Sequence, residues 1–202
     1  LKFDSLIKFY PFFEINTNLN INELNRDISN FMILKKIFKN PEIVKKLNSK
    51  NKIYYQKKKF SRGLINNFSS ETNLFYGRLY STSKIFFEGG NIACKKESNM
   101  IEQYPRIYFN CTFNIDDKKK FFKNFSINKK VNNKRVRINV LGSLNIFNKK
   151  INFEKILIDK EKKIQDEELK YFKETFEFHV FDENFLDIFK KKKIKNFLQE
   201  II

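Results

Sequence analysis

The residues best suited to chemistry in this chain are cations, and the chemistry they predict is phosphate binding. Between Lys118 and Lys150 the sequence has eleven Lys and Arg residues and no Asp or Glu. Such side chains neutralise the phosphates of a nucleic acid, and the release of its condensed counterions makes this binding favourable. The stretch therefore predicts an interface with a polyanion, of which nucleic acid is the commonest kind.

The charge of the whole chain indicates the same class of partner. The 202 residues carry a formal net charge of +18. Residues 1–104 have 18 basic and 9 acidic groups and residues 105–202 have 23 and 14, so each half carries +9. A chain that is basic along its whole length favours embedding in RNA over a single docking patch. An anionic membrane surface and a generically basic soluble surface are the alternatives.

Residues for catalysis or metal binding are few. Cys94, Cys111 and His179 are too scattered for a structural zinc site, which takes about four such ligands. Cys111 is expected to be a buried, unreactive thiol and His179 a surface residue. The carboxylates at 166–168 are expected on a solvated helix face. We expect no enzyme, no metal ion, no cofactor and no small-molecule substrate.

The second half of the chain has the clearest elements. Residues 106–115 alternate, with Ile107, Phe109, Cys111, Phe113 and Ile115 on one face, which predicts a half-buried strand. The strand expected at 135–141 carries Arg135 and Arg137 on the face opposite its apolar residues. Such a sheet packs helices on one side and meets phosphate on the other. The remaining expected elements are strands at 151–159 and 175–181, helices within 117–130 and 162–173, and a basic amphipathic tail at 194–202.

This order of elements predicts an α+β fold class for residues 105–202. The arrangement is ferredoxin-like (split βαβ), a four-stranded antiparallel sheet with two helices on one face. Residues 1–104 are expected to form an α/β extension with helices near 21–47, a loop at 48–59 and strands at 74–80 and 84–96, the second folded into a hairpin at Gly89-Gly90. Elements of this size are marginal alone, so we expect RNA and neighbouring proteins to order the extension and to bury Phe9, Phe12, Phe13 and Ile15.

Composition bears on the source and the compartment. The chain has 25 Phe and only five Gly. Because Lys, Asn, Ile and Phe have AT-rich codons, the composition indicates a strongly AT-biased genome, such as that of an organelle or a parasite. The sequence has no run of about 20 uncharged apolar residues, so no membrane partner is expected. Its first residues lack the order of a signal peptide.

Residues 105–202 also resemble the S-ten family of the small ribosomal subunit. The resemblance lies in the basic opening strand 106–109, Gly142 at the start of an extended loop, and the pair Lys149-Lys150 ahead of Phe153. It continues with Phe176-Glu177-Phe178, Leu186-Asp187-Ile188 and the basic tail. In departure from the family, residues 142–150 have no proline, and Phe181-Asp182-Glu183-Asn184 stands where the family has a basic run. Residues 1–104 match nothing in the family.

The resemblance implies a non-catalytic constituent of the head of the small ribosomal subunit, which binds ribosomal RNA and neighbouring ribosomal proteins. Together with the composition it implies a mitochondrial ribosome, in the matrix. Phosphate contacts would position such a protein, and it would read RNA shape more than sequence. The expected RNA-binding residues are Arg106, Lys118, Lys119, Lys120, Lys129, Lys130, Lys134, Arg135, Arg137, Lys149, Lys150 and Lys155.

Two other classes of binding protein stay open. Residues 40–47 followed by several strands resemble the soluble, protein-binding domain of a mitochondrial presequence-translocase accessory subunit. A sheet-type RNA-recognition domain has the same topology as the expected fold. Its glycine-flanked aromatic motif is missing from the expected central strand at 135–141, which has no aromatic residue.

Overall fold

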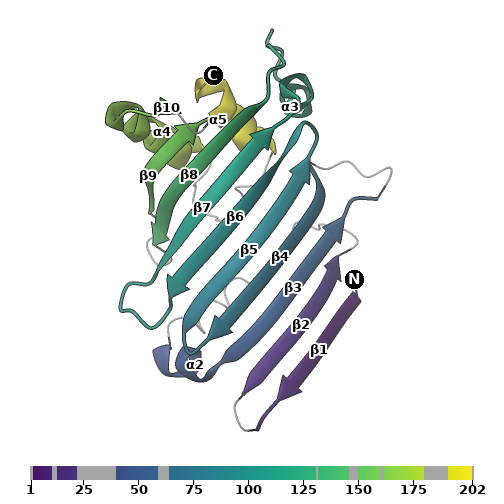
Figure 1. The fold of residues 1–202 in the computed structure, drawn as a ribbon, viewed down its shortest axis with the longest axis vertical. Helices are drawn as coiled ribbons and strands as arrows, with labels where there is room; N and C mark the ends of the chain where they lie inside the picture. Colours follow the sequence, from purple (N-terminus) through teal and green to yellow (C-terminus); the bar gives the residue numbers. More distant parts are fainter. Residues whose placement is uncertain are drawn as a thin grey trace.

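The computed structural model describes residues 2–10, 13–21, 40–58, 64–130, 132–145, 150–159, 162–179 and 191–201. Ten strands form one sheet in which they lie side by side in chain order (Figure 1). The strands are β1 (Lys2–Lys8), β2 (Glu14–Ile21), β3 (Asn48–Gln56), β4 (Ile65–Phe75), β5 (Arg78–Phe87), β6 (Gly90–Asn99), β7 (Arg106–Ile115), β8 (Val136–Asn145), β9 (Ile151–Ile158) and β10 (Lys162–Lys163). The helices are α2 (Pro41–Lys46), α3 (Lys118–Asn124), α4 (Asp166–His179) and α5 (Lys191–Ile201).

The length of each connection agrees with the direction in which the two strands that it joins are paired. Every neighbouring pair is antiparallel except β2 and β3, which run parallel. Parallel strands need a crossover of a dozen or more residues, and residues 22–47 supply it. Short connections join β4 to β5 and β5 to β6, which makes this part of the sheet a meander.

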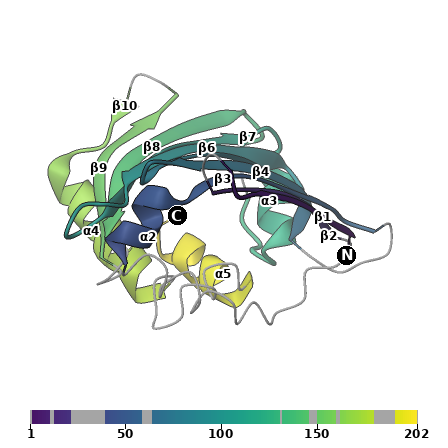
Figure 2. The same cartoon turned by 90° about the horizontal axis from the view of Figure 1, so that it is seen from below.

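The sheet is arched, and its two faces differ in what covers them. Figure 2 shows all four described helices on the concave side of the arch. No described helix lies on the convex side (Figure 2). Because strand residues alternate between faces, a strand that a helix covers gives every second side chain to that helix and the others to the open face.

The hydrophobic core lies between the concave face and the helices, in three clusters. One joins Phe121, Phe122, Phe125 and Ile127 to Phe87, Ile115, Ile194 and Leu198, and so connects α3 and α5 to the sheet. The second packs Leu169, Phe172 and Phe176 of α4 on Val140, Phe153 and Ile156. The third places Val44 of α2 against Leu74, Leu79 and Met100. Each helix is therefore held to the sheet by apolar burial.

The turn between β5 and β6 fixes the position of α3. Gly89 has a φ of +91°, a conformation that side chains with a Cβ rarely adopt. A Cβ on Gly89 would also lie 2.5 Å from the Asp117 carbonyl oxygen. The Gly89 carbonyl accepts hydrogen bonds from the backbone N–H groups of Asp116 and Asp117. Asp117 then caps α3 by accepting a 3.0 Å bond from the Lys120 N–H.

The expected fold class, a ferredoxin-like four-stranded sheet with two helices, is wrong. The strand expected at 106–115 is confirmed as β7, and those expected at 135–141 and 151–159 correspond to β8 and β9. The fourth strand, expected at 175–181, falls largely within α4. The sheet instead continues through β6, which pairs with β7, into the first half of the chain.

Residues 166–179 form a helix rather than ending in the expected strand because their aromatic residues also have helical spacing. Phe172 and Phe176 are four residues apart and lie on one helix face. Their ring centroids are 5.2 Å and 5.4 Å from that of Phe153. The acidic first turn, Asp166 to Glu168, suits the positive end of a helix. The alternation of Phe176 and Phe178, which predicted a strand, leaves Phe178 80% exposed.

The first half of the chain departs from the sequence prediction at several places. The loop expected at 48–59 contains β3, whose alternating Ile53 and Tyr55 are partly or fully buried. The strand expected at 74–80 is interrupted by the turn at Tyr76 and Gly77. The turn expected near Gly89 is confirmed, and α2 lies within the range 21–47 in which helices were expected. Residues 22–39 of that range lie outside the described residues, and the expected domain boundary between residues 104 and 105 stays a prediction.

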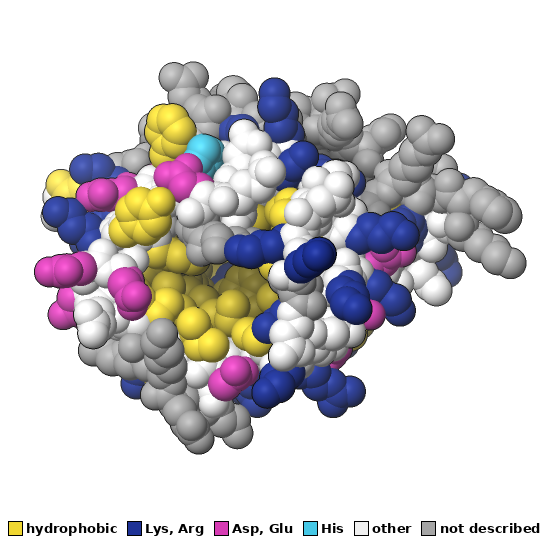
Figure 3. Space-filling model, turned by 90° about the horizontal axis from the view of Figure 1, so that it is seen from above, with side chains coloured by type: hydrophobic (Ala, Val, Ile, Leu, Met, Phe, Trp, Pro, Cys, Tyr) yellow, Lys and Arg dark blue, Asp and Glu magenta, His cyan; other side chains and the backbone are white. Residues whose placement is uncertain are grey.

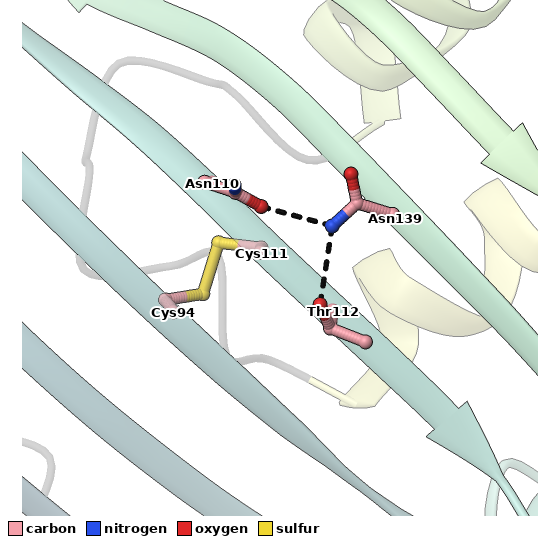
Figure 4. Close-up of a disulfide and its surroundings, with 5 residues drawn as sticks. All are labelled: Cys94, Asn110, Cys111, Thr112 and Asn139. Atoms are coloured by element: carbon pink, nitrogen blue, oxygen red, sulfur yellow. Dashed lines mark hydrogen bonds between the residues drawn. A yellow bond between two sulfur atoms is a disulfide. The ribbon is translucent and has the colours of Figure 1, made fainter. Parts of the chain in front are cut away.

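Cys111 is not the unreactive thiol that the sequence predicted. Cys94 and Cys111 are directly opposite each other on β6 and β7 and form a disulfide, with Cα atoms 4.1 Å apart (Figure 4). Cys111 does share its face with Phe109 and Phe113, as the alternation predicted. Alternation identifies the face but not the partner, because it carries no information on the pairing of β6 with β7.

Candidate nucleic-acid interface

The described helices leave the convex face of the sheet open (Figure 2). On β3, β5 and β7 it carries Tyr54, Tyr80 and Tyr108, which are 45%, 48% and 46% exposed. Their chain neighbours Tyr55, Leu79 and Phe109 point to the other face and pack in the interior. Alternation on a sheet with one covered face therefore places these tyrosines in solvent.

Tyr80 and Tyr108 lie in the same row across the strands. Tyr80 is opposite Glu97 on β6, and Glu97 is opposite Tyr108 on β7. Two strand spacings separate the tyrosines, about 10 Å. Aromatic rings on an open sheet are the platforms on which sheet-type RNA-binding modules stack two or three unpaired bases.

The convex face is also basic. At its exposed positions on β3 to β8 it has two acidic residues, Glu71 and Glu97. The basic residues at those positions are Lys50, Lys52, Arg78, Lys84, Lys95, Arg106 and Arg137. The resulting excess of positive charge is spread among the tyrosines rather than gathered in one place. Such a surface can contact the phosphates of a strand whose bases lie on the rings.

Polar side chains on this face also tie the strands to one another. The Asn139 amide donates to the Asn110 Oδ1 at 2.9 Å and to the Thr112 Oγ1 at 3.1 Å, from β8 to β7 (Figure 4). On β7 and β6, Asn114 donates to Asn91 at 3.0 Å. These bonds join neighbouring strands on the convex side, as the disulfide joins β6 and β7 on the concave side (Figure 4).

Most of the basic residues predicted from the sequence gather at one end of the sheet. We call this group the α3 cluster, and it consists of Lys118, Lys119, Lys120, Lys129, Lys130, Lys134, Arg135 and Arg137. They lie on α3, on the segment that follows it, and at the start of β8 (Figure 1). Two of them contact acids loosely: Arg135 lies 3.8 Å from Asp116, and Lys120 lies 3.8 Å from Asp117.

The other predicted residues lie elsewhere. Arg106 begins β7 and Lys150 precedes β9, so both are at the opposite end of the sheet, about 30 Å from the α3 cluster along ten-residue strands. Lys155 lies on β9 opposite Leu141, next to the irregularity between Leu141 and Gly142. Lys149 is outside the described residues. The described residues of the belt predicted at 118–150 are therefore divided between two ends of the sheet.

Basic and acidic side chains lie on opposite sides of the end of the molecule that Figure 3 shows. Lys and Arg side chains gather on the right of this view, where α3 lies, and several Asp and Glu side chains lie on the left, toward α4. A hollow with a hydrophobic floor separates the two sides (Figure 3). An extended polyanion would be attracted to the α3 side and repelled from the other.

Sequence reasoning missed the residues of β3 to β6 on this face. Tyr54 and Lys52 fall in an expected loop, and Tyr80 falls in an expected strand to which no face was assigned. Tyr108 was placed correctly on the polar face of its strand. A tyrosine in the polar phase of an alternating segment is the signal that would have marked all three, because Tyr is otherwise commonly packed inside.

Lys96 points from the sheet to the concave side, inside the arch. Lys96 on β6 is opposite Ser81 of β5 and Phe109 of β7. In the described part of the chain it makes no ion pair, and burial lowers the pKa of its ammonium group. Ser81 is 7% exposed, and its hydroxyl group forms a hydrogen bond with that of Thr72 on β4.

Residues for metal binding do not gather in the described ranges. These ranges contain no cluster of three or more His, Cys, Asp or Glu side chains that could hold a metal ion. His179 on α4 contacts Glu200 of α5, so it connects two helices. None of the helices in the described ranges has the length and apolar content needed to cross a bilayer.

No protein-family model matches this chain, and no curated protein or solved structure matches it. The case for function therefore depends on the residues and geometry described above.

Proposed function

We propose that this protein is a non-catalytic RNA-binding constituent of a ribonucleoprotein particle, with the small ribosomal subunit as the first particle to test. The observation that carries the proposal is the convex face, which no described helix covers and which combines Tyr54, Tyr80 and Tyr108 with an excess of Lys and Arg. Cations supply affinity for phosphates, and exposed rings stack on bases.

Single-stranded RNA fits this face better than a duplex. Bases inside a helix are stacked on one another and offer no free face to a side chain, whereas unpaired bases can lie on tyrosine rings. The α3 cluster lies at one end of the sheet, and Arg106 and Lys150 lie at the other. A strand that crosses the sheet would meet cations at both ends.

The S-ten resemblance contributes less to this proposal than the surface does. The resemblance implied a ferredoxin-like fold, which the protein does not have. The residues expected to begin its extended loop, Gly142 to Asn145, belong to β8 and pair with β7. The ribosomal and mitochondrial assignments therefore stand on composition, charge and the quoted motifs alone.

The first experiment measures fluorescence anisotropy of labelled RNAs with the whole protein. We expect single-stranded RNA to bind more tightly than a duplex of the same length, with an affinity that falls steeply as salt rises. A variant with Tyr54, Tyr80 and Tyr108 changed to Ala should lose most of the preference for single strands. Equal binding of both RNAs by the wild type would contradict stacking on the convex face.

The second experiment is co-sedimentation with ribosomal small subunits after a high-salt wash. A ribosomal constituent stays with the subunit. Dissociation in the wash together with retained binding to free RNA would leave RNA binding in place but contradict the ribosomal assignment.

Two observations favour a second candidate, a protein-interaction domain such as that of a presequence-translocase accessory subunit. The edge strand β1 exposes Phe3, Leu6 and Ile7 at 58%, 55% and 50%, and its outer backbone groups face no described strand. An exposed apolar edge can pair with a strand from another protein. The disulfide favours a compartment in which disulfides persist.

The two candidates make opposite predictions for one variant. Substituting Asn for Leu6 and Ile7 should weaken binding to a partner that pairs with β1, while the affinity for single-stranded RNA should be unchanged. Loss of RNA binding by this variant would instead place the RNA site at the edge strand.

A further inference from the structure

A pocket with a basic lining lies where α3 and α5 meet the turn between β5 and β6. Its volume is about 670 Å³. The lining residues are Asn66, Phe87, Glu88, Gly89, Lys120, Lys123, Asn124 and Lys191. Three of these described residues are lysines and one is a glutamate, which gives them together a net charge of +2.

The three lysines come from two helices that are held in place by burial. Lys120 and Lys123 are three residues apart and share a face of α3. Lys191 lies at the start of the described part of α5. Ile194 and Leu198 of α5 pack on the buried phenylalanines of α3. The core therefore fixes the two helix segments that carry the lysines.

Most of the polar groups in this lining have no partner within the described chain. Lys123 and Lys191 make no ion pair there, and Lys120 has only the 3.8 Å contact with Asp117. The Nδ2 atom of Asn124 is buried and lacks a hydrogen-bond partner. That atom has almost no accessible surface, so a ligand in the pocket would be met by the three ammonium groups instead.

We propose that this pocket binds the phosphomonoester group of a nucleotide, either free or at the end of an RNA strand. A phosphomonoester carries nearly two negative charges at pH 7 and has three acceptor oxygens, which matches the net charge of the lining and its three ammonium donors. A phosphodiester within a strand carries one charge and has two free oxygens. Phe87 gives the same pocket an apolar wall next to Phe121. This site does not depend on RNA binding by the convex face.

The test is isothermal titration calorimetry with the whole protein. The probes are adenosine 5′-monophosphate, adenosine, and one short RNA with and without a terminal phosphate. Adenosine 5′-monophosphate should bind, and its affinity should fall as the pH is lowered through about 6, where the phosphate dianion takes up a proton and loses one charge. Adenosine should not bind measurably.

Two matched variants separate this pocket from general charge. Changing Lys120, Lys123 and Lys191 to Gln should weaken binding of adenosine 5′-monophosphate at least about tenfold, since hydrogen bonds to a charged group are worth that much. Changing Lys46, Lys170 and Lys173 to Gln removes the same charge outside the pocket, and the affinity should stay within about twofold of the wild type. Circular dichroism of both variants checks that the fold is kept.

The outcomes identify the source of the phosphate or overturn the site. A roughly tenfold increase in RNA affinity from the terminal phosphate assigns the pocket to RNA ends. Binding of adenosine 5′-monophosphate without that increase assigns it to free nucleotide. Equal binding of adenosine and its monophosphate, with no effect of the terminal phosphate, overturns the proposal. An equal loss of affinity in both lysine variants also overturns it, because the binding would then follow overall charge.

Discussion

The two faces of the arched sheet are made by alternate residues of the same strands, yet they have opposite chemistry. On β7, Phe109 and Phe113 face α4 and help to form the core, while Tyr108 and Asn110 face the open convex side. The helices, the disulfide and the aromatic clusters are all on the concave side. Because the concave face alone holds the core, the residues of the convex face are available for binding without loss of the fold.

The difference between the faces can be tested by substituting one residue on each face and comparing the loss of stability. Phe153 is 7% exposed and its ring contacts those of Phe109, Phe172 and Phe176. Phe153→Ala should lower the free energy of unfolding by about 3–5 kcal/mol, because it leaves a cavity in the core. Tyr108→Ala should change it by about 0.5 kcal/mol. Urea unfolding of both variants is the measurement, and similar losses of stability would contradict the division between the faces.

The disulfide should stabilise the concave side without taking part in binding. Cys94 and Cys111 are 17 residues apart. Closing a loop of that size contributes about 3 kcal/mol by limiting the unfolded chain. The double change to Ala should remove this amount in urea unfolding and leave RNA affinity as it was. A large drop in RNA affinity would mean that the convex surface depends on this crosslink.

On the convex face, the tyrosines should matter for binding and not for stability. Tyr80→Ala combined with Tyr108→Ala should weaken binding of single-stranded RNA by about 1–3 kcal/mol for each ring removed. Tyr171→Ala is the matched control, since Tyr171 is 51% exposed on α4, away from this face. Anisotropy titrations with all three proteins decide the point, and an equal effect of the control would refute a specific platform.

The basic residues at the two ends of the sheet should determine how strongly RNA affinity depends on salt. Changing Arg135 and Arg137 to Glu removes two cations from the α3 cluster, and changing Lys150 to Glu removes one from the opposite end. For every cation that neutralises an RNA phosphate, its removal should reduce the slope of log affinity against log salt by about one unit. A slope that changes for one end only would show that RNA covers half of the face.

The smallest expected effect comes from Lys96 inside the arch. Burial lowers the pKa of Lys96 in the folded protein, so between the folded and unfolded pKa values the unfolded chain binds more protons. Stability should therefore rise with pH in that alkaline window. Lys96→Met should be more stable than the wild type at pH 7, and this difference should shrink as the pH rises. A pH-independent difference in urea unfolding would mean that the substitution acts through packing.

Alternation allowed part of the fold to be predicted from the sequence. It fixed β7 and its two faces, because period-two spacing over 106–115 has no helical alternative. It failed at 175–181, where Phe172, Phe176 and Thr175 also fit a helix and tertiary contact with Phe153 decides. It failed at β3 because the polar residues of that strand lie on the open face, which gives the composition of a loop.

The sequence predicted the part of the candidate site in which many basic residues lie close together along the chain. The α3 cluster comes from one basic stretch, and its lysines were predicted one by one. The tyrosine surface is assembled from β3, β5 and β7, and its residues come together only through strand pairing between distant segments. No property of Tyr54 or Tyr80 alone indicates that pairing, so neither was identified.

The most direct test of the central claim is photocrosslinking of single-stranded RNA to the whole protein, with mass spectrometry to locate the crosslinked residues. If the convex face binds unpaired bases, crosslinks should form at Tyr54, Tyr80 or Tyr108 and disappear when unlabelled single-stranded RNA is added in excess. Crosslinks confined to α4, α5 or the edge strand β1, with none on these tyrosines, would contradict the account.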